Sequence, residues 1–176
     1  MLFTTHSVLG ATLGVATGDP KTGFILGFLS HHLIDAMPHF DQGSFYVLKG
    51  GPTYIKSVEK KEIEVNGYEE SFGKREWIMF FIDVSIAAIL FLIIFHTHPP
   101  KEWLSIIAGA IGGLLPDIID SSPLWSEKLR AKIKLVNYYH RFHSFFHWTV
   151  GKENFFWELL TQFIIMTFSL YYLVVL

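Results

Sequence analysis

The sequence WIMFFIDVSIAAILFLIIF at residues 77–95 decides the fold class, because it is apolar throughout except for Asp83 and Ser85. A helix of about 20 such residues crosses a hydrocarbon core about 30 Å thick. A second run, FFWELLTQFIIMTFSLYYLVVL at residues 155–176, has only Glu158 and Gln162 as strongly polar residues. A chain of 176 residues is too short to bury two such helices in a soluble core. We therefore expect a membrane-spanning protein.

The overall composition agrees with a membrane protein and limits its partners. Hydrophobic residues make up 51% of the chain, and the mean hydropathy is +0.36. Charged residues make up 17%, against roughly 25% in an average soluble domain. The length favours one domain, residues 1–176. A net charge of −2 gives no basic field for nucleic acid, and without cysteine any metal must be held by imidazole and carboxylate groups.

Three shorter segments, at residues 5–17, 22–37 and 103–119, are apolar and rich in glycine. Small residues let membrane helices approach closely, so these segments are expected inside the bundle. Asp19-Pro20 and Pro99-Pro100 predict tight turns within two helical pairs. The predicted fold is an all-α polytopic membrane bundle of about five helices.

A faint internal duplication is one interpretation of the helical pairs. His6 and Asp83 stand near the start of each pair, 77 residues apart, and Pro38-His39 and Pro116-Asp117 end each pair, 78 residues apart. A real repeat would give two similar helical hairpins followed by a C-terminal transmembrane helix. Chance similarity between apolar sequences is the alternative.

The basic residues are distributed unevenly along the chain, which predicts an orientation. The short turns hold Lys21 and Lys101, and the other 12 of 14 lie in two long connections, residues 38–76 and 120–154. The positive-inside rule places these connections and the N-terminus in the cytoplasm, and the C-terminus outside. The first connection is expected to form a cytoplasmic insert with a small hairpin or cap. The second contains a basic amphipathic helix at residues 125–138, which would lie on the membrane surface or simply present a solvated face.

Histidine and aspartate residues occur at helix-compatible spacings near the expected cytoplasmic face. His31 and Asp35 are four residues apart, so one helical face could present both to a single cation, and His39 follows. Asp117 and Asp120 end the fourth helix. In the second connection, histidines at positions 140, 143 and 147 have i, i+3 and i+7 spacing.

The expected topology brings these groups together with His6 and Asp83. Asp83 would lie roughly 10 Å below the interface, at 1.5 Å per residue. A charge at the centre of a membrane helix costs roughly 2.5–3.5 kcal/mol unless it is paired. The predicted metal ligands are His6, His31, Asp35, His39, Asp83, Asp117, His140 and His143. Each single histidine could instead be an amphipathic anchor, as expected for His32 and His147, but that alternative explains the whole set less well.

The chain resembles the bacterial and archaeal inner-membrane metal-dependent hydrolases. The resemblance rests on Thr5-His6, on Pro116-Asp117-Ile118-Ile119-Asp120, and on His140-Arg141-Phe142-His143-Ser144, in that order. The family's two aspartates are one residue closer, its His-Arg-to-His interval is longer, and a histidine usually stands at the position of Ser121. The pair His31 and Asp35 also resembles zinc-ligand helices of the zinc-dependent phospholipase C superfamily. These resemblances imply a location in the inner membrane and ligand roles for Asp117, His140 and His143.

The predicted function is metal-dependent hydrolysis of a phosphoester or phospholipid-like headgroup at the cytoplasmic face. Mixed histidine and aspartate ligands suit zinc, or a two-metal site with manganese or iron. Arg141 is the candidate phosphate clamp and, with Asp120, a candidate catalytic residue. Membrane lipids are the expected partners. A metal or ion transporter and a structural membrane protein without catalysis are the alternatives.

Overall fold

The computed structural model describes residues 1–39, 74–122, 124–146 and 155–175, and all the regular structure within them is helical. The predicted all-α class is therefore confirmed for this part of the chain. The expected hairpin or cap in the first connection lies almost wholly in residues 40–73, outside the described residues. The helices are α1 (Phe3–Thr17), α2 (Pro20–Asp35), α4 (Lys74–Thr97), the short 3-10 helix η1 (Pro100–Glu102), α5 (Trp103–Asp120), α6 (Ser126–Lys132), α7 (Lys134–Phe146) and α8 (Phe155–Val175).

The two predicted turns are present, and local chemistry explains the first. Gly18 ends α1 in a left-handed conformation (φ 63°), which glycine adopts without steric cost. Asp19 then caps α2 by accepting a hydrogen bond from the backbone N–H of Thr22 at 2.8 Å, and Pro20 occupies the first helical turn. These bonds to Thr22 also hold the pKa of the exposed Asp19 carboxyl below its usual value. Pro99 precedes η1 at the second turn.

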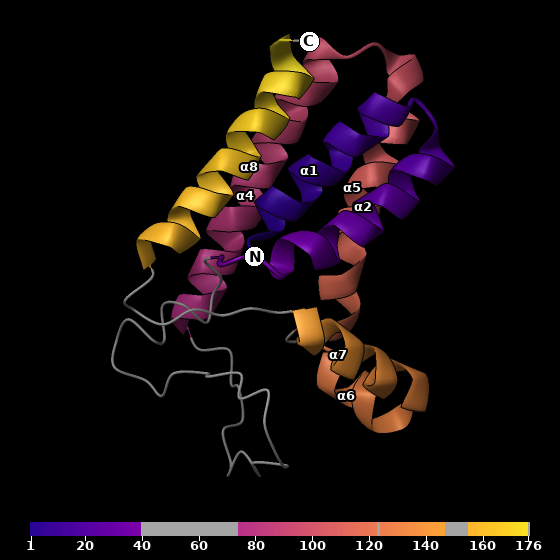
Figure 1. Ribbon diagram of the computed structural model, residues 1–176, viewed down its shortest axis with the longest axis vertical. Helices are drawn as coiled ribbons and strands as arrows, with labels where there is room; N and C mark the ends of the chain where they lie inside the picture. The colour runs from indigo at the N-terminus through magenta and orange to yellow at the C-terminus, as the bar shows by residue number, and fades with distance from the viewer. Residues whose placement is uncertain (40–73, 123, 147–154, 176) are drawn as a thin grey trace.

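Helices α1, α2 and α5 pack tightly against one another because glycine lets their backbones touch (Figure 1). A Cβ atom on Gly10 would overlap the carbonyl oxygen of Gly109, and a Cβ on Gly27 would overlap that same oxygen from α2. Gly113 makes a similar close approach to the carbonyl oxygen of His6. This close contact is the packing expected of small residues in a membrane bundle.

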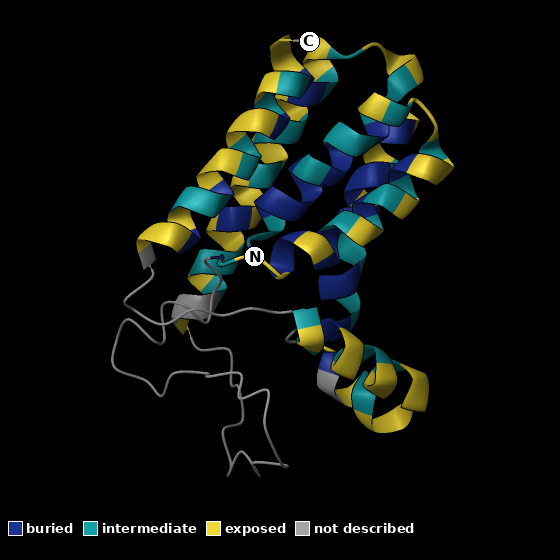
Figure 2. Ribbon diagram, viewed as in Figure 1, coloured by how far each residue is buried: buried dark blue, intermediate teal, exposed yellow. Residues whose placement is uncertain are grey.

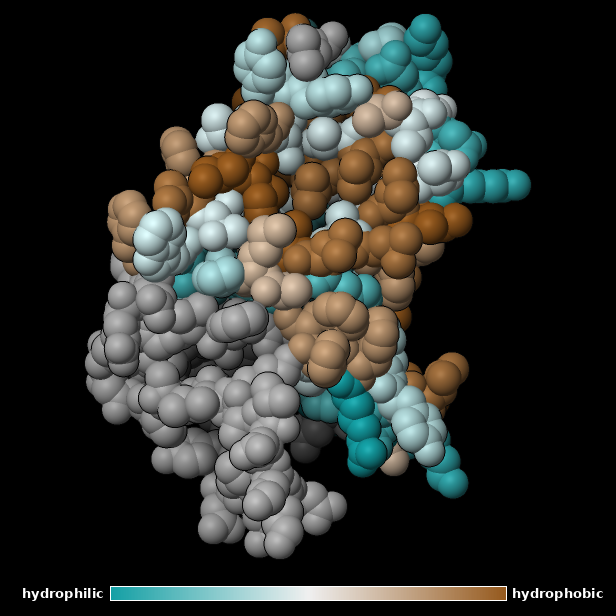
Figure 3. Space-filling view, in the orientation of Figure 1, coloured by the Kyte–Doolittle hydropathy of each residue, from teal (hydrophilic) through white to brown (hydrophobic). Residues whose placement is uncertain are grey.

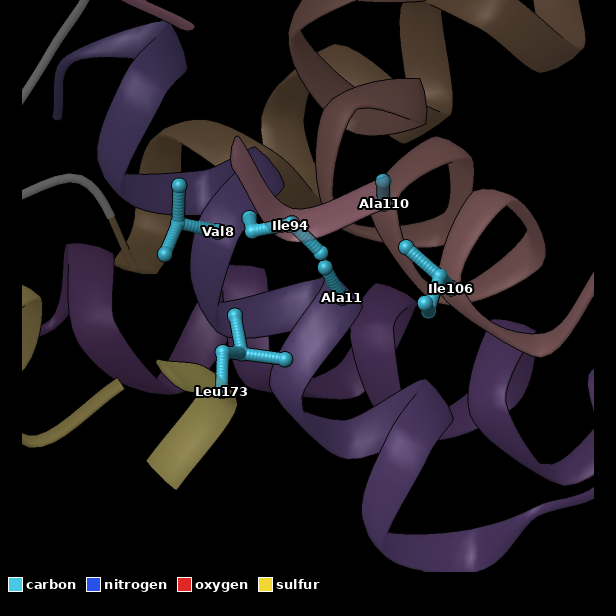
Figure 4. Packing of buried hydrophobic residues seen from close by; sticks show 6 residues of the cluster. All are labelled: Val8, Ala11, Ile94, Ile106, Ala110 and Leu173. Atoms are coloured by element: carbon cyan, nitrogen blue, oxygen red, sulfur yellow. The ribbon is translucent and has the colours of Figure 1, made fainter. Parts of the chain in front are cut away.

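A small apolar core lies where α4 and α8 join α1 and α5. Figure 4 shows Val8 and Ala11 of α1 beside side chains from α4, α5 and α8, namely Ile94, Ile106, Ala110 and Leu173. The rest of α4 and α8 is largely exposed (Figure 2). Hydrophobic side chains predominate across the middle of the face seen in Figure 3, between hydrophilic residues near the top and bottom.

Three stretches are long and apolar enough to cross a membrane: Trp77–Thr97, Pro100–Asp120 and Phe156–Val175. The chain is therefore a helical membrane protein by length and composition. Helices α1 and α2 have 15 and 16 residues, which corresponds to only about 22–24 Å at 1.5 Å per residue. They form a short hairpin beside longer helices.

The starts of three helices and the ends of two others lie at the same end of the bundle. Helices α1, α4 and α8 begin at this end and α2 and α5 finish there, as the predicted topology requires (Figure 1). The two helical pairs do not pack alike. Helices α1 and α2 contact each other closely, whereas α4 packs on α1 and α8, and α5 packs on α1 and α2. If a duplication exists, it is preserved in the order of elements more than in their packing.

The second connection contains two helices where one was predicted over residues 125–138. Ile133 adopts an extended conformation (φ −120°, ψ 106°) and separates α6 from α7. Helix α7 is amphipathic, with Leu135, Tyr138 and Phe145 exposed and His143 buried. The break turns α7 back toward α5 and α2, where it delivers its histidines.

Candidate metal centre

Four buried side chains converge at the end of the bundle where α2 and α5 finish. They are His31 and Asp35 from α2, Asp117 from α5 and His143 from α7. Each offers one nitrogen or oxygen atom, and all four atoms lie within 4.8 Å of one another. Helical periodicity explains the pair on α2, since residues four apart share a face.

The distances within this cluster match those around a small cation. Nε2 of His31 lies 3.0 Å from Oδ2 of Asp35, 3.0 Å from Nε2 of His143 and 3.7 Å from Oδ1 of Asp117. A tetrahedral ion with bonds of about 2.0–2.1 Å separates its ligand atoms by about 3.3–3.4 Å. The observed spacings bracket that value, so the four residues can hold a metal ion with small adjustments.

Both histidines of the cluster are held by hydrogen bonds through their other ring nitrogen. Nδ1 of His31 lies 2.7 Å from the carbonyl oxygen of Gly113, which can only accept, so Nδ1 carries the hydrogen. Nδ1 of His143 lies 2.9 Å from Oδ2 of Asp120. In a neutral imidazole, an Nδ1–H fixed in this way leaves Nε2 with a lone pair directed at the centre, which is the usual arrangement of metal-binding histidines.

Asp120 is not one of the four residues of the cluster, but its carboxylate binds a histidine of the cluster. Its carboxylate accepts from His143 and also from Nδ1 of His140 at 2.8 Å. Arg130 of α6 donates to the carbonyl oxygen of Asp120 at 2.6 Å. Of the two residues predicted from the His-Arg motif to bind metal, the structure brings His143 to the centre and His140 to this supporting carboxylate.

His6 and His39 lie on the opposite side of Asp35 from His143. Nε2 of His6 lies 3.2 Å from Oδ1 of Asp35 and 3.8 Å from Oδ2 of Asp117, and its ring stacks on that of His31. Nε2 of His39 lies 3.9 Å from Oδ1 of Asp35. The amino group of Met1 also lies 3.2 Å from this oxygen. The structure thus gathers six predicted ligands: His6, His31, Asp35, His39, Asp117 and His143.

Two predicted site residues have other positions. Asp83 is buried in α4, where it accepts hydrogen bonds from the backbone N–H of Phe3 at 2.7 Å and of Thr4 at 3.2 Å. Thr4 Oγ1 also donates to Asp83. The carboxylate therefore caps the start of α1, where helix N–H groups lack partners of their own. Arg141 is exposed on α7.

His32 and Tyr139 belong to the surroundings of the site and were not predicted as part of it. His32 is buried, and its ring packs edge-on against His31, His143 and Phe142. The hydroxyl of Tyr139 lies 3.4 Å from Nε2 of His32. Burial and the nearby carboxylates raise the pKa of Tyr139. The i, i+4 spacing of Tyr139 and His143 was the available signal, but it could not reveal that α7 folds back onto α2.

The electrostatics of the cluster favour a positive charge at His143. Burial by itself would lower the pKa of His143, but hydrogen bonds to Asp120 and Asp35 and the charge of Asp117 raise it to about 9. The same carboxylates that stabilise this proton would stabilise a bound cation. His96 and His98, at the opposite end of the bundle, are remote from this field.

The fold and this cluster define the protein as a polytopic helical membrane protein with a buried His/Asp cluster at one end of its bundle. Comparisons with protein-family models, curated proteins and solved structures return no significant match.

Proposed function

We propose that the protein is a membrane-embedded, metal-dependent phosphoester hydrolase. The observation that carries the proposal is the convergence of His31, Asp35, Asp117 and His143 with their supporting hydrogen bonds. Two imidazole Nε2 atoms lie 3.0 Å apart beside two carboxylate oxygens. A divalent cation could therefore replace the proton that these four groups share.

The residues present suit a divalent ion with nitrogen and oxygen ligands. Zinc fits a tetrahedral set of this kind, and manganese or iron are alternatives. The ion would lower the pKa of a bound water toward neutrality and polarise a phosphoryl oxygen. The chain's own contribution is to orient the ligands: Gly113 fixes His31 and Asp120 fixes His143. Arg141 is proposed to attract the phosphate from its exposed place on α7.

A phospholipid-like substrate is the class that the location of the site favours. The cluster lies at the end of a short hairpin in a bundle with lipid-compatible surfaces. Helix α7 adds exposed apolar residues next to the site, and Lys128, Lys132 and Lys134 give this region a basic character. With the positive-inside rule, these features support a site at the cytoplasmic face of a cell membrane.

The motifs that resemble the inner-membrane metal-dependent hydrolases support the same proposal. His6, Asp117, Asp120, His140 and His143 come from three distant parts of the sequence, yet contacts through His31 join them in one continuous network. A chance match of short motifs gives no reason for such proximity. We propose membership of this family on that basis.

The distribution of buried ionisable groups speaks against the transporter alternative. Among the described residues, the buried histidines, aspartates and glutamate all lie toward the end that holds the cluster: His6, His31, His32, Asp35, His39, Asp83, Asp117, Asp120, His143 and Glu158. A path for ions across the bilayer would place ionisable groups along the whole bundle, whereas the other buried polar side chains of the described residues, such as Ser105 and Ser169, are uncharged. The gathering at one end suits a local reaction site.

The experiment combines metal content with hydrolysis. Detergent-purified protein would be loaded with Zn²⁺ or Mn²⁺, desalted and assayed for bound metal, then tested on a chromogenic phosphodiester and on short-chain phospholipids. We expect bound metal and metal-dependent hydrolysis in the wild type, and loss of both in Asp117→Ala and His143→Ala. The matched control is His96→Ala, which removes an exposed imidazole at the other end of α4. Retention of metal and activity in Asp117→Ala and His143→Ala would refute the proposal, as would a wild type that binds neither ion.

A further inference from the structure

We propose that the same two carboxylates hold a second divalent cation, bound by His6 and His39, so that the site is binuclear. This inference rests on the proposed function, because it assumes the ion between His31 and His143. It adds a site on the opposite side of Asp35 and Asp117.

The two oxygens of each carboxylate face different histidines. Oδ2 of Asp35 lies 3.0 Å from Nε2 of His31, while its Oδ1 lies 3.2 Å from Nε2 of His6. Asp117 repeats the division: Oδ1 lies 3.7 Å from His31, and Oδ2 lies 3.8 Å from His6. Two carboxylates shared in this way would bridge two ions, one on each side.

The stacked rings of His6 and His31 set the distance between the two ions. Their centroids are 3.8 Å apart and their planes differ by 20°. Both Nε2 atoms also approach the carboxylate of Asp35, so the two rings point the same way and their lone pairs lead to points a similar distance apart. Ions in two-metal hydrolytic sites are about 3.5–4 Å apart. The stacking therefore presents the two nitrogens at a separation suited to a pair of ions.

His6 provides independent evidence of a ligand, because its buried Nε2 faces carboxylate oxygens. The residue is 1% exposed, and Nε2 lies 3.2 Å from Oδ1 of Asp35 and 3.8 Å from Oδ2 of Asp117, without the geometry of a hydrogen bond. A bound ion between these three acceptor atoms would satisfy all of them. His39 adds a second nitrogen: its Nδ1 donates to the carbonyl oxygen of Met37 at 2.8 Å, so in the neutral ring the lone pair is on Nε2, which lies 3.9 Å from Oδ1 of Asp35.

A binuclear centre agrees with the phosphoryl transfer to water that the proposed function requires. Ions held by Asp35 and Asp117 with His6, His31, His39 and His143 would supply activation of the attacking water and stabilisation of the leaving oxygen. The P–O bond to the leaving group would break, the water oxygen would form the new P–O bond, and the leaving alkoxide would take up a proton that the water has lost. No oxidant or further co-reactant is needed.

The test counts ions in the full-length protein in detergent, with Mn²⁺ as the probe. Bound Mn²⁺ would be measured by titration and by electron paramagnetic resonance, which distinguishes an exchange-coupled pair from an isolated ion. We expect two equivalents and a coupled spectrum in the wild type, and in the His96→Ala control. His6→Ala and His39→Gln should each retain one equivalent with the spectrum of an isolated ion. The variant at His39 guards against misfolding of His6→Ala, and gel filtration would confirm that each protein is folded.

The outcomes separate this inference from the proposed function. A wild type with one uncoupled equivalent, unchanged in His6→Ala and His39→Gln but lost in His143→Ala, would overturn the second ion and leave the first intact. A wild type with no bound Mn²⁺ at any tested concentration would overturn both. Two equivalents that persist in both variants would also refute the assignment of His6 and His39.

Discussion

The glycine-packed helices α1, α2 and α5 and the flanking helices α4 and α8 are all apolar, yet they use this character differently. In the spanning stretch that contains α5, 44% of the most apolar window is buried inside the protein, against 11% in α4 and 22% in α8. The first three helices use their small residues for backbone contact, and each contributes ionisable side chains to the end of the bundle that holds the cluster. Helices α4 and α8 direct large side chains such as Leu92 and Phe168 outward. Hydropathy detects the second group most readily, while the first group holds the site.

The difference between the two groups of helices predicts that the largest loss of stability will come from a substitution at a glycine contact. Gly109→Val on α5 would drive a side chain into the backbone of Gly10, which cannot move aside as a flexible side chain would. We expect a loss of about 3 kcal/mol or more in the free energy of unfolding, at the upper end of the costs of overpacking. Ala88→Val on the exposed face of α4 is the control and should change stability by less than about 0.5 kcal/mol. Thermal unfolding in detergent would measure the stability of both variants. An equal loss of stability in Gly109→Val and Ala88→Val would contradict the distinction between the two groups of helices.

The pH dependence should distinguish the site from the rest of the protein. Because its neighbours raise the pKa of His143 to about 9, this ligand carries a proton at neutral pH that a cation must displace. Affinity for Mn²⁺ should therefore rise by up to about tenfold per pH unit from pH 6.5 to 8.5. Without added metal, the raised pKa stabilises the fold fully below the unfolded pKa near 6.5, and this contribution is lost as pH rises through about 9. Opposite trends of Tm with and without Mn²⁺ would check the sign, and parallel trends would contradict it.

A smaller effect is expected from the carboxylate that supports His143. Asp120→Asn keeps the size of the side chain but weakens the bonds to His143 and His140. Substitution of a group that holds a metal-binding histidine typically lowers metal affinity 10–100-fold. Isothermal titration with Mn²⁺ or Zn²⁺ would measure the change. A loss as complete as in Asp117→Ala would mean that Asp120 itself binds the ion.

The smallest effect concerns Asp83, where the two groups of helices meet. Asp83→Ala removes the acceptor for the first N–H groups of α1, and loss of a helix cap costs about 0.5–2 kcal/mol. Metal affinity per folded molecule should change little, because both carboxylate oxygens of Asp83 are engaged with α1. Ser85→Ala, two residues along the same helix, serves as the control. If a folded Asp83→Ala protein no longer bound metal, the prediction that Asp83 is a metal ligand would be supported after all.

The elements of the fold could be predicted because each leaves a local signal. Apolar length marks α4 and α8, and Asp19-Pro20 marks the first turn. The packing could not be predicted in the same way. No local signal shows that α1 lies between α4 and α5, since that depends on which glycines of distant helices face each other. The extended residue Ile133 inside a continuous basic amphipathic pattern was equally hidden.

The sequence predicted which residues lie near the candidate site better than it predicted what each residue does there. Counting termini at one face brought His6, His31, Asp35, His39, Asp117 and His143 together correctly. The roles of Asp83 and Asp120 depend on distances of a few ångströms between separate helices. Their carboxylates look alike in the sequence, but one caps α1 and the other orients two histidines.

The origin of the cluster in helices far apart along the chain has a consequence for biosynthesis. His31 and His143 are 112 residues apart, so at about 5–20 residues per second a ribosome needs roughly 6–22 s to add the second after the first. Throughout that interval the growing chain contains α1 and most of α2 but lacks α7. The cluster can therefore form only after most of the chain has been synthesised, and the proposed metal would be loaded at the end of assembly. A cell could use that final step to distinguish finished molecules from those due for proteolysis.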